Sequence, residues 1–294
     1  VLMDGQGNSP VGHLQRGDLS PRDQVSRALV QAMRRQGVTQ MWLDFSAIPR
    51  SKAEARFPTI LDRCSEFGLN PLERPIPIAP AAHYWMGGVA TDLNAATDLP
   101  GLYAVGEVAC TGLHGANRLA SNSLMECLVF AHQMAAIELG PVPALKTGSA
   151  ARHCDLSLSA GESSSGLIGR IEQLRQLCWR SAGVDRDAAA LRGALTKIEG
   201  EQAQLATEEL LQELLQQDPE QAQVLSDGSR RDLNLLLDLH HRLRTSQLML
   251  EACLFRRESR GGHFRRDAPT RLPYWRHHSR QIKTRGVHTR AVRP

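Results

Sequence analysis

The sequence predicts an α+β protein with more than one domain. At 294 residues, 41% of them apolar, the chain can bury more than one hydrophobic core. Up to about residue 150, short strand-like runs alternate with helical segments. Beyond a linker rich in proline, glycine and serine, helical periodicity dominates and prolines are few.

The first region, residues 1–79, mixes helix and strand. A helix start is encoded by Ser20 as N-cap and Pro21 in the first helical position, and Gly37 is placed to end this helix. We then expect a strand over 41–45, a helix over 53–66 and an extended chain over 71–80, where prolines restrict their predecessors.

The other two regions differ in character. In residues 80–150 we expect two short strands, 88–91 and 102–105, and one apolar helix over 122–139. In residues 151–294 helical periodicity predicts a small antiparallel bundle followed by an irregular tail after Gly261. The bundle helices are expected at 167–181, 188–215 and 229–257.

A short path in the second region carries side chains suited to anionic ligands. Ser121-Asn-Ser123 begins a helix, whose first N–H groups and positive dipole end attract anions. Arg118 can bind a carboxylate through two parallel N–H bonds, and His83 can add one directed bond. The alternatives are ordinary N-capping at Ser121 and a purely structural histidine.

Three blocks of this sequence resemble one family of flavoenzymes. The stretch 83–126, with His-Gly-Ala-Asn-Arg-Leu-Ala-Ser-Asn-Ser over 114–123, is similar to the flavin site of L-aspartate oxidases, which belong to the succinate dehydrogenase and fumarate reductase flavoprotein superfamily. The segments 16–28 and 256–269 resemble further motifs of that superfamily. The resemblance implies an FAD enzyme whose N-terminal half of the FAD domain is missing from this chain.

The resemblance also implies an architecture and a set of site residues. Residues 1–79 would be a partial substrate-capping domain, 80–150 the C-terminal segment of the FAD-binding α/β domain, and 151–294 a helical domain with a basic tail. Arg22 would donate or accept a proton in catalysis. The substrate would contact His83, Arg118 and Ser121, and FAD would contact Glu107, Ser123 and Leu124.

The implied activity is FAD-dependent oxidation of L-aspartate to iminoaspartate, with oxygen or fumarate as electron acceptor. This is the first step of de novo NAD biosynthesis, with quinolinate synthase as the next enzyme. Ala120-Ser121 after the arginine motif favours the oxidases, since succinate dehydrogenase and fumarate reductase chains carry glycine there. The alternatives are such a dehydrogenase or reductase flavoprotein, or an inactive fragment that serves only as a binding module.

Charge and cysteine content address the remaining functional classes. The net charge of +4 hides a basic tail, because twelve Lys and Arg face only Glu258 and Asp267 from Arg256 onward. Such a tail suits nucleic acid or a membrane surface, or it forms a basic rim that neutralises acidic helices or anionic ligands. Without an aromatic stacking platform we expect no nucleic-acid binding, and because no apolar run approaches ~20 residues we expect no membrane span. Six cysteines without C-x-x-C pairs predict free thiols in a cytoplasmic protein without a metal site.

Overall fold

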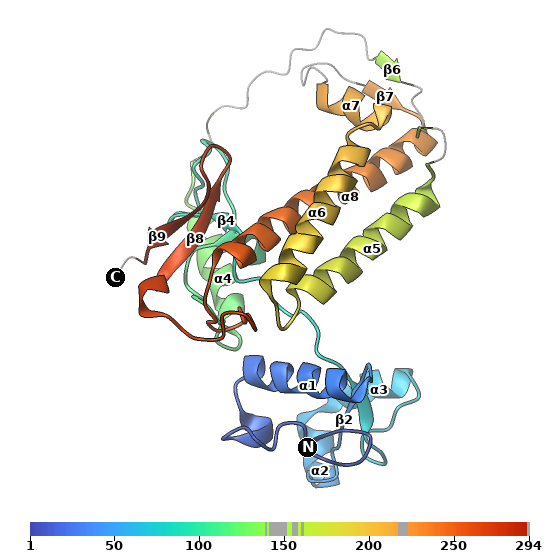
Figure 1. The fold of residues 1–294 in the computed structure, drawn as a ribbon, viewed down its shortest axis with the longest axis vertical. Helices are drawn as coiled ribbons and strands as arrows, with labels where there is room; N and C mark the ends of the chain where they lie inside the picture. Colours follow the sequence, from blue (N-terminus) through green and yellow to red (C-terminus); the bar gives the residue numbers. More distant parts are fainter. Residues whose placement is uncertain (139, 141–151, 155–157, 160–161, 217–222, 293–294) are drawn as a thin grey trace. The chain divides into compact units, whose positions relative to one another are not determined.

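A computed structural model describes residues 1–138, 140, 152–154, 158–159, 162–216 and 223–292. The chain divides into two compact units, Val1–Tyr84 and Trp85–Pro294 (Figure 1). Both mix helices with small sheets, as the sequence predicts for an α+β protein.

The first unit is a small sheet covered by a helix. Strands β1 (Leu2–Met3), β2 (Met41–Leu43) and β3 (Ile76–Ile78) are antiparallel, with β2 in the middle. Helix α1 (Arg22–Gln36) buries one apolar face and shares a hydrophobic cluster with the sheet, in which the side chain of Met41 is fully buried. Burial of this face, more than helix propensity, stabilises α1.

Local signals predict the C-terminal end of α1 but not its start. Gly37 ends the helix in the left-handed conformation (φ 67°), which glycine adopts without a Cβ clash, as predicted. The start is one residue later than expected. Pro21, and not Ser20, occupies the N-cap position, so no side-chain oxygen caps the first turn.

Two further expectations in this unit need correction. The helix expected over 53–66 is broken into α2 (Arg50–Arg56) and α3 (Pro58–Glu66), because Pro58 lacks an N–H and forces Phe57 out of helical geometry (φ −129°). The segment 71–80 is extended as a strand only at β3. Before it, the side chain of Asn70 accepts the N–H of Leu72 at 3.1 Å and makes a turn.

The second unit begins with a short mixed segment. Strand β4 (Val89–Ala90) pairs in parallel with β5 (Ala109–Cys110), which follows the 3₁₀ turn η2 (Gly106–Val108) and leads to helix α4 (Asn122–Met134). The strand expected over 102–105 is wrong, since that stretch forms only an isolated bridge through Tyr103. The helix expected to reach residue 139 ends at Met134.

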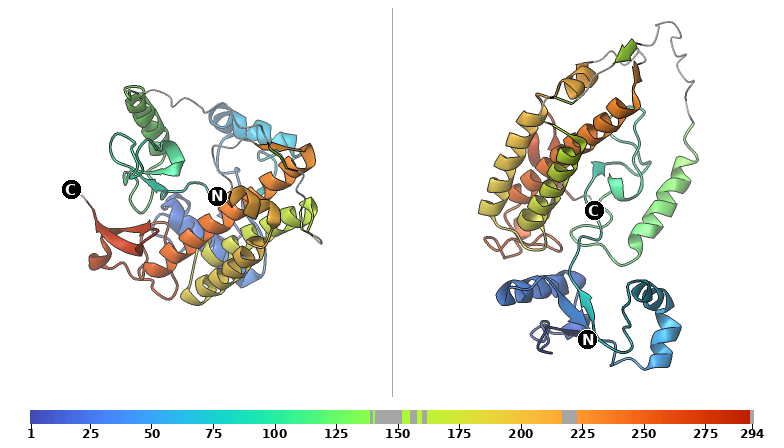
Figure 2. Two further views of the ribbon diagram at one scale, coloured as in Figure 1. Left: turned by 90° about the horizontal axis from the view of Figure 1, so that it is seen from above. Right: turned by 90° about the vertical axis from the view of Figure 1, so that its right-hand side faces the viewer.

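A helix bundle forms most of the second unit. It contains α5 (Ser164–Ala182), α6 (Ala188–Leu205), α7 (Glu209–Gln216) and α8 (Asp227–Phe255), and α5 and α6 both lie along α8 (Figures 1 and 2). The helix expected over 188–215 is therefore interrupted after Leu205. Directly before α8 in the chain, β7 (Gln223–Leu225) pairs in parallel with β6 (Arg152–Cys154).

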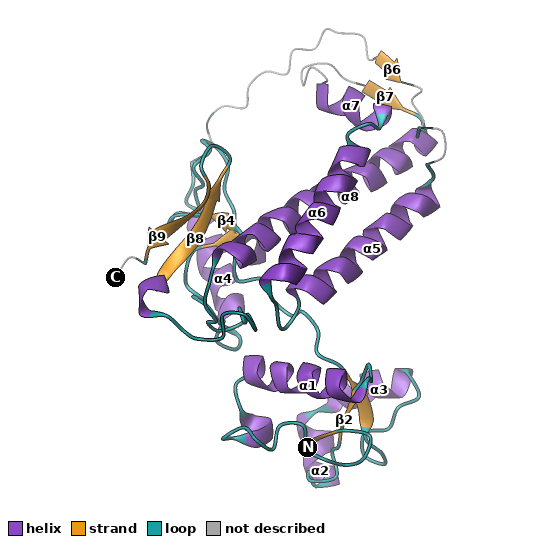
Figure 3. Cartoon of the chain, viewed as in Figure 1, coloured by secondary structure: helices purple, strands orange, loops and turns teal. Residues whose placement is uncertain are grey.

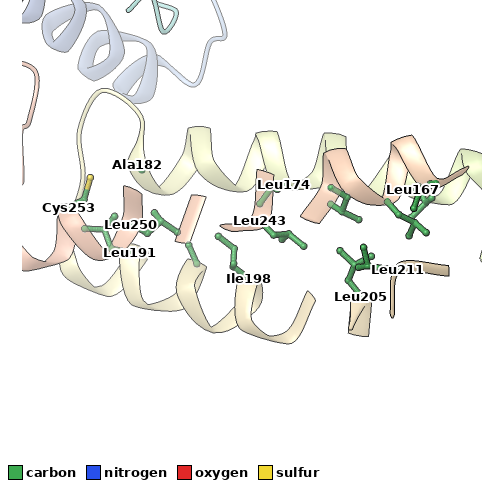
Figure 4. Close-up of a cluster of buried hydrophobic side chains, with 14 of the residues drawn as sticks. Leu167, Leu174, Ala182, Leu191, Ile198, Leu205, Leu211, Leu243, Leu250 and Cys253 are labelled. Carbon is green, nitrogen blue, oxygen red and sulfur yellow. The ribbon is translucent and has the colours of Figure 1, made fainter. Parts of the chain in front are cut away.

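Leucines fill the interior of the bundle. Facing side chains of α5, α6 and α8 interdigitate along its length (Figure 4), and Leu236 and Leu243 are almost completely buried. Three helices begin with side-chain caps, Ser163, Asp187 and Ser226, each accepting an N–H from the first turn. None of the helices within the described ranges is long and apolar enough to cross a membrane.

The tail is ordered, which corrects the irregular structure expected after Gly261. A 3₁₀ turn η3 (Pro273–Trp275) leads into the antiparallel hairpin of β8 (His277–Ile282) and β9 (Gly286–Ala291) (Figure 3). Arg256, at the end of α8, donates to the carbonyl oxygens of Trp275 (3.0 Å) and His277 (2.5 Å). The hairpin thus depends on a contact that is remote in sequence.

Candidate functional site

The loop between β5 and α4, residues 111–121, carries the predicted substrate ligands and is called the site loop below. Its first part is fixed to α4 by a buried carboxylate. Thr111 donates its hydroxyl to Oε1 of Glu126 at 2.5 Å, and Nε2 of His114 lies 2.8 Å from Oε2. The side chains of His114 and Glu126 are only 5% and 2% exposed. Because an ionised carboxylate only accepts, Nε2 of His114 carries the hydrogen.

Glu126 is a residue whose role the sequence did not reveal. It lies within the quoted motif, but an acidic residue near a helix start is ordinarily an exposed partner of the dipole. The available signal was its position inside an otherwise apolar helix, because a carboxylate in such surroundings needs hydrogen-bond donors. The structure supplies these donors from the site loop.

Arg118 lies half-buried near the end of the site loop. Its backbone N–H donates to the sulfur of Met86 at 3.0 Å, which brings the stretch after His83 against the loop. Its guanidinium group donates from Nη1 to the carbonyl of Leu119 at 3.3 Å. The backbone is thus tied to a remote segment, while Nη1 of the guanidinium makes a local contact.

Ser121 adopts an unusual conformation at the N-cap of α4. Its φ of 63° lies in the left-handed region, and its side chain does not cap the helix. The alternative of ordinary side-chain capping is therefore not what the structure shows. A non-glycine residue held in this conformation costs free energy, which is characteristic of ligand sites. Ser123 and Leu124 follow in the first turn, and Leu124 is 67% exposed.

Glu107 lies at the surface in the turn η2. Its Oε1 accepts the N–H of Trp85 at 2.8 Å. The carboxylate therefore links the stretch after His83 to the turn η2, two stretches that the sequence assigns to one site. Gly106 directly before it has φ 81° and Gly112 has φ 91°, conformations that allow a backbone to approach a ligand without a Cβ in the way.

Helix α4 exposes an apolar surface that is large for its length. Only Glu126 and Phe130 of this helix are buried. The large exposed apolar side chains of α4 are those of Leu124, Met125, Leu128, Val129 and Met134. Contiguous exposed apolar side chains of this kind mark a surface that another element or ligand covers.

The remaining predicted residues belong to the first unit. Arg22 is the first residue of α1 and is exposed, and His83 is exposed near the end of that unit. The structure therefore groups Glu107, Arg118, Ser121, Ser123 and Leu124 in the second unit. Whether Arg22 and His83 join them at one substrate stays a prediction.

The arrangement in the second unit suits an anionic ligand that carries hydroxyl groups. The exposed carboxylate of Glu107 can accept hydrogen bonds from hydroxyls. Glycines in left-handed conformations allow close contact with the backbone, and the accessible start of α4 attracts negative charge. Within the described ranges, no group of three or more His, Cys, Asp or Glu is placed to hold a metal ion.

Comparison with known proteins gives two family matches. Residues 1–124 match the FAD binding domain family, and residues 171–292 match the fumarate reductase flavoprotein C-terminal family. The chain is 40% identical to the L-aspartate oxidase of Synechocystis sp. over 95% of its own length and 51% of that protein. It is 36% identical to the L-aspartate oxidase of Rhodospirillum rubrum over 94% of its own length and 88% of that protein.

Solved structures show the same fold. A quinol-fumarate reductase solved with menaquinol molecules aligns with a TM-score of 0.73 at 24% identity, covering 100% of this chain and 55% of that one. Mycobacterium smegmatis Sdh1 in complex with UQ1 aligns with a TM-score of 0.63 at 26% identity, covering 94% and 46%. The chain thus spans about half the length of most of these proteins.

Proposed function

Because the chain belongs to the L-aspartate oxidase family of the succinate dehydrogenase and fumarate reductase flavoproteins, we propose that it forms the substrate-binding part of an FAD-dependent L-aspartate oxidase. The observation that carries the proposal is the site loop, which presents Arg118 beside the exposed start of α4. The product would be iminoaspartate, and the reaction would open NAD biosynthesis ahead of quinolinate synthase in the cytoplasm.

In this proposal the chain contributes to three parts of the enzyme. Residues 1–79 act as part of the substrate-capping domain, 80–150 as the C-terminal segment of the FAD domain, and 151–294 as the helical domain. The apolar side chains of α4 support this division, since they would be covered by the half of the FAD domain that the longer relatives possess.

The substrate is a four-carbon dicarboxylate with an amino group. Arg118 would grip one carboxylate through two N–H bonds, while His83 and the hydroxyl of Ser121 would add single bonds. The left-handed backbone of Ser121 leaves its hydroxyl unused as a helix cap and therefore available to a ligand. Oxidation removes a hydride from Cα and a proton from the amino nitrogen.

Arg22 would move the proton. A free guanidinium hardly ever loses a proton, because its pKa lies far above neutral, so the role requires a dry site with other cations nearby or a relay through which the proton passes. Within the described residues, Arg22 makes no ion pair, which leaves its charge unneutralised at the start of α1. A cation there is mildly unfavourable against the helix dipole, which supports a functional role over a stabilising one.

FAD would contact Glu107, Ser123 and Leu124. When bound it would accept the hydride, and oxygen or fumarate would take up the two electrons. Glu107 would accept hydrogen bonds from cofactor hydroxyls, and the first turn of α4 would stabilise negative charge on the reduced ring.

The test joins this chain to the N-terminal half that its longer relatives carry and measures bound flavin and turnover. We expect FAD absorbance and oxidation of L-aspartate with oxygen or fumarate as acceptor. Oxidation of succinate without oxidation of L-aspartate would contradict the proposal and identify a dehydrogenase or reductase. Retention of FAD without either activity would reduce the chain to a binding module.

A further inference from the structure

The second half of the site loop is held by the C-terminal part of the chain. The N–H of Gly262 donates to the carbonyl oxygen of Ala116 at 3.0 Å, two residues before Arg118. Gly261 adopts φ 58°, and a Cβ at this position would lie 2.0 Å from the same oxygen. No side chain fits there, so the two backbones touch only because residue 261 is glycine.

The turn that reaches the loop, residues 260–263, is itself rigidly supported. Glu258 is fully buried and accepts hydrogen bonds from Arg256 (2.6 Å), Arg260 (2.7 Å) and the backbone N–H of Leu272 (2.9 Å). The N–H of Arg260 donates to the carbonyl of His263 at 2.7 Å and closes the turn. A buried carboxylate satisfied from three directions has few alternative arrangements, which fixes the turn in position.

The site loop is therefore held at two points before Arg118. Glu126 of α4 binds Thr111 and His114, and the 260–263 turn binds Ala116. Met86 contributes a third contact, because its sulfur accepts the N–H of Arg118 and its methyl carbon would lie 3.4 Å from a Cβ at residue 262.

We propose that the 260–263 turn positions Arg118, so that Gly261 is a positioning residue for substrate binding although it lies in the C-terminal domain. The assignment of Arg118 to a substrate carboxylate rests on the proposed function. The mechanical link between the turn and the loop does not, because it follows from the contact of Gly261 with Ala116. The C-terminal domain thereby controls the geometry of a binding site formed by another segment.

The test compares three glycine variants. Gly261→Ala places a Cβ against the backbone of Ala116, where only movement of the loop or the turn can relieve the clash. Gly286→Ala is the matched control for backbone strain, since its φ of 64° is similar but no atom lies within 4 Å of the added Cβ. Gly262→Ala controls for a substitution in the same turn, because its Cβ would lie 3.4 Å from the flexible end of Met86 and only at ordinary contact distance, 4.0 Å, from the carbonyl oxygen of Ala116.

Hydrogen exchange of the chain itself reads out the link without reference to activity. We expect the amides of residues 112–118 to exchange at least about fivefold faster in Gly261→Ala than in either control. In the FAD-loaded enzyme that contains this chain, we expect the same variant to raise KM for L-aspartate at least ~10-fold, since a displacement of about 1 Å can cost ~10²-fold in rate. FAD affinity should change less than about twofold in all three variants.

Two results would overturn the proposal. If Gly261→Ala and Gly286→Ala give equal exchange in the site loop, the turn does not hold the loop. If exchange rises but KM for L-aspartate stays at the wild-type value, the turn holds the loop without positioning Arg118. Absence of turnover in the wild type would refute the proposed function while leaving the exchange result valid.

A second variant covers the case in which Gly261→Ala does not fold. Arg260→Lys keeps the charge but loses the paired bonds to Glu258, and so loosens the turn without a clash. Its control is Arg257→Lys on the exposed side of the same segment. We expect faster exchange in the site loop and a raised KM for Arg260→Lys only, and equal behaviour of the two variants would overturn the proposal.

Discussion

His263 should make the stability of the C-terminal domain depend on pH. Its Nδ1 lies 2.9 Å from Nη1 of Arg186, and a guanidinium can only donate, so Nδ1 must accept. Nε2 then carries the hydrogen and points to the carbonyl of Arg256 at 3.3 Å. Burial, reinforced by the positive charges of Arg186, Arg256 and Arg265, lowers the pKa of His263 from 6.5 to about 4.

The sign and the size of the effect follow from that pKa. Above pH 6.5 the imidazole is neutral in both the folded and the unfolded chain. Between pH 6.5 and 4 the unfolded chain binds a proton that the folded chain does not, so the free energy of unfolding falls as the pH falls. The difference between 6.5 and about 4 corresponds to ~3 kcal/mol, fully lost once the pH is below both values.

The variant that isolates this contribution is His263→Gln. Glutamine can accept from Arg186 and donate to the carbonyl of Arg256, but it does not titrate. Urea unfolding followed by far-UV circular dichroism at pH 7.5, 6 and 5 would give the free energy of unfolding of both proteins. We expect the wild type to lose stability faster than the variant on acidification, by up to ~1.4 kcal/mol per pH unit.

Other groups that titrate act in both proteins and cancel in the difference. Hydrogen bonds and ion pairs lower the pKa of Asp187, Glu258 and Asp267, so these carboxylates contribute stability that is lost only at more acidic pH. His132→Gln, at an exposed position of α4, is the control for a histidine without burial. Equal pH slopes for the wild type and His263→Gln would refute the reasoning.

Three further predictions concern catalysis, the bundle core and the apolar surface. In the FAD-loaded enzyme, Arg118→Lys should mainly raise KM for L-aspartate, because lysine cannot make the two parallel N–H bonds of arginine. Arg22→Leu should instead lower kcat at least ~10²-fold with FAD still bound. A wild-type kcat of Arg22→Leu in steady-state kinetics would disprove the role of Arg22 in proton transfer. Leu236→Ala should lower the free energy of unfolding by ~2–5 kcal/mol in urea titrations, because the side chain is 0% exposed. Leu124→Ala should change the free energy of unfolding of this chain by less than ~0.5 kcal/mol but weaken its association with the N-terminal half that longer relatives carry, measured by titration of the two parts. Unchanged association would argue against a covering partner at Leu124.

Several features were readable from the sequence because their causes are local. The end of α1 depends on one glycine that adopts a left-handed conformation, and the start of the apolar helix at Asn122 was read from the residues next to it. The family was readable because its motifs are contiguous runs of residues. The break at Pro58 also has a local cause, since a proline restricts its predecessor in any context, although the spacing over 53–66 predicts one helix.

Other features were decided only by the tertiary structure, because their causes lie far apart in the chain. The tail forms a hairpin from mostly basic and polar residues, which give only a weak apolar signal, and Arg256 supports it from the end of α8. The carboxylate of Glu126 has a role only where Thr111 and His114 reach it. The need for glycine at residue 261 arises from the carbonyl oxygen of Ala116, which no pattern around residue 261 could indicate. Local sequence specifies caps, turns and motifs, whereas the burial of a charge or the contact of two backbones depends on which remote segments meet.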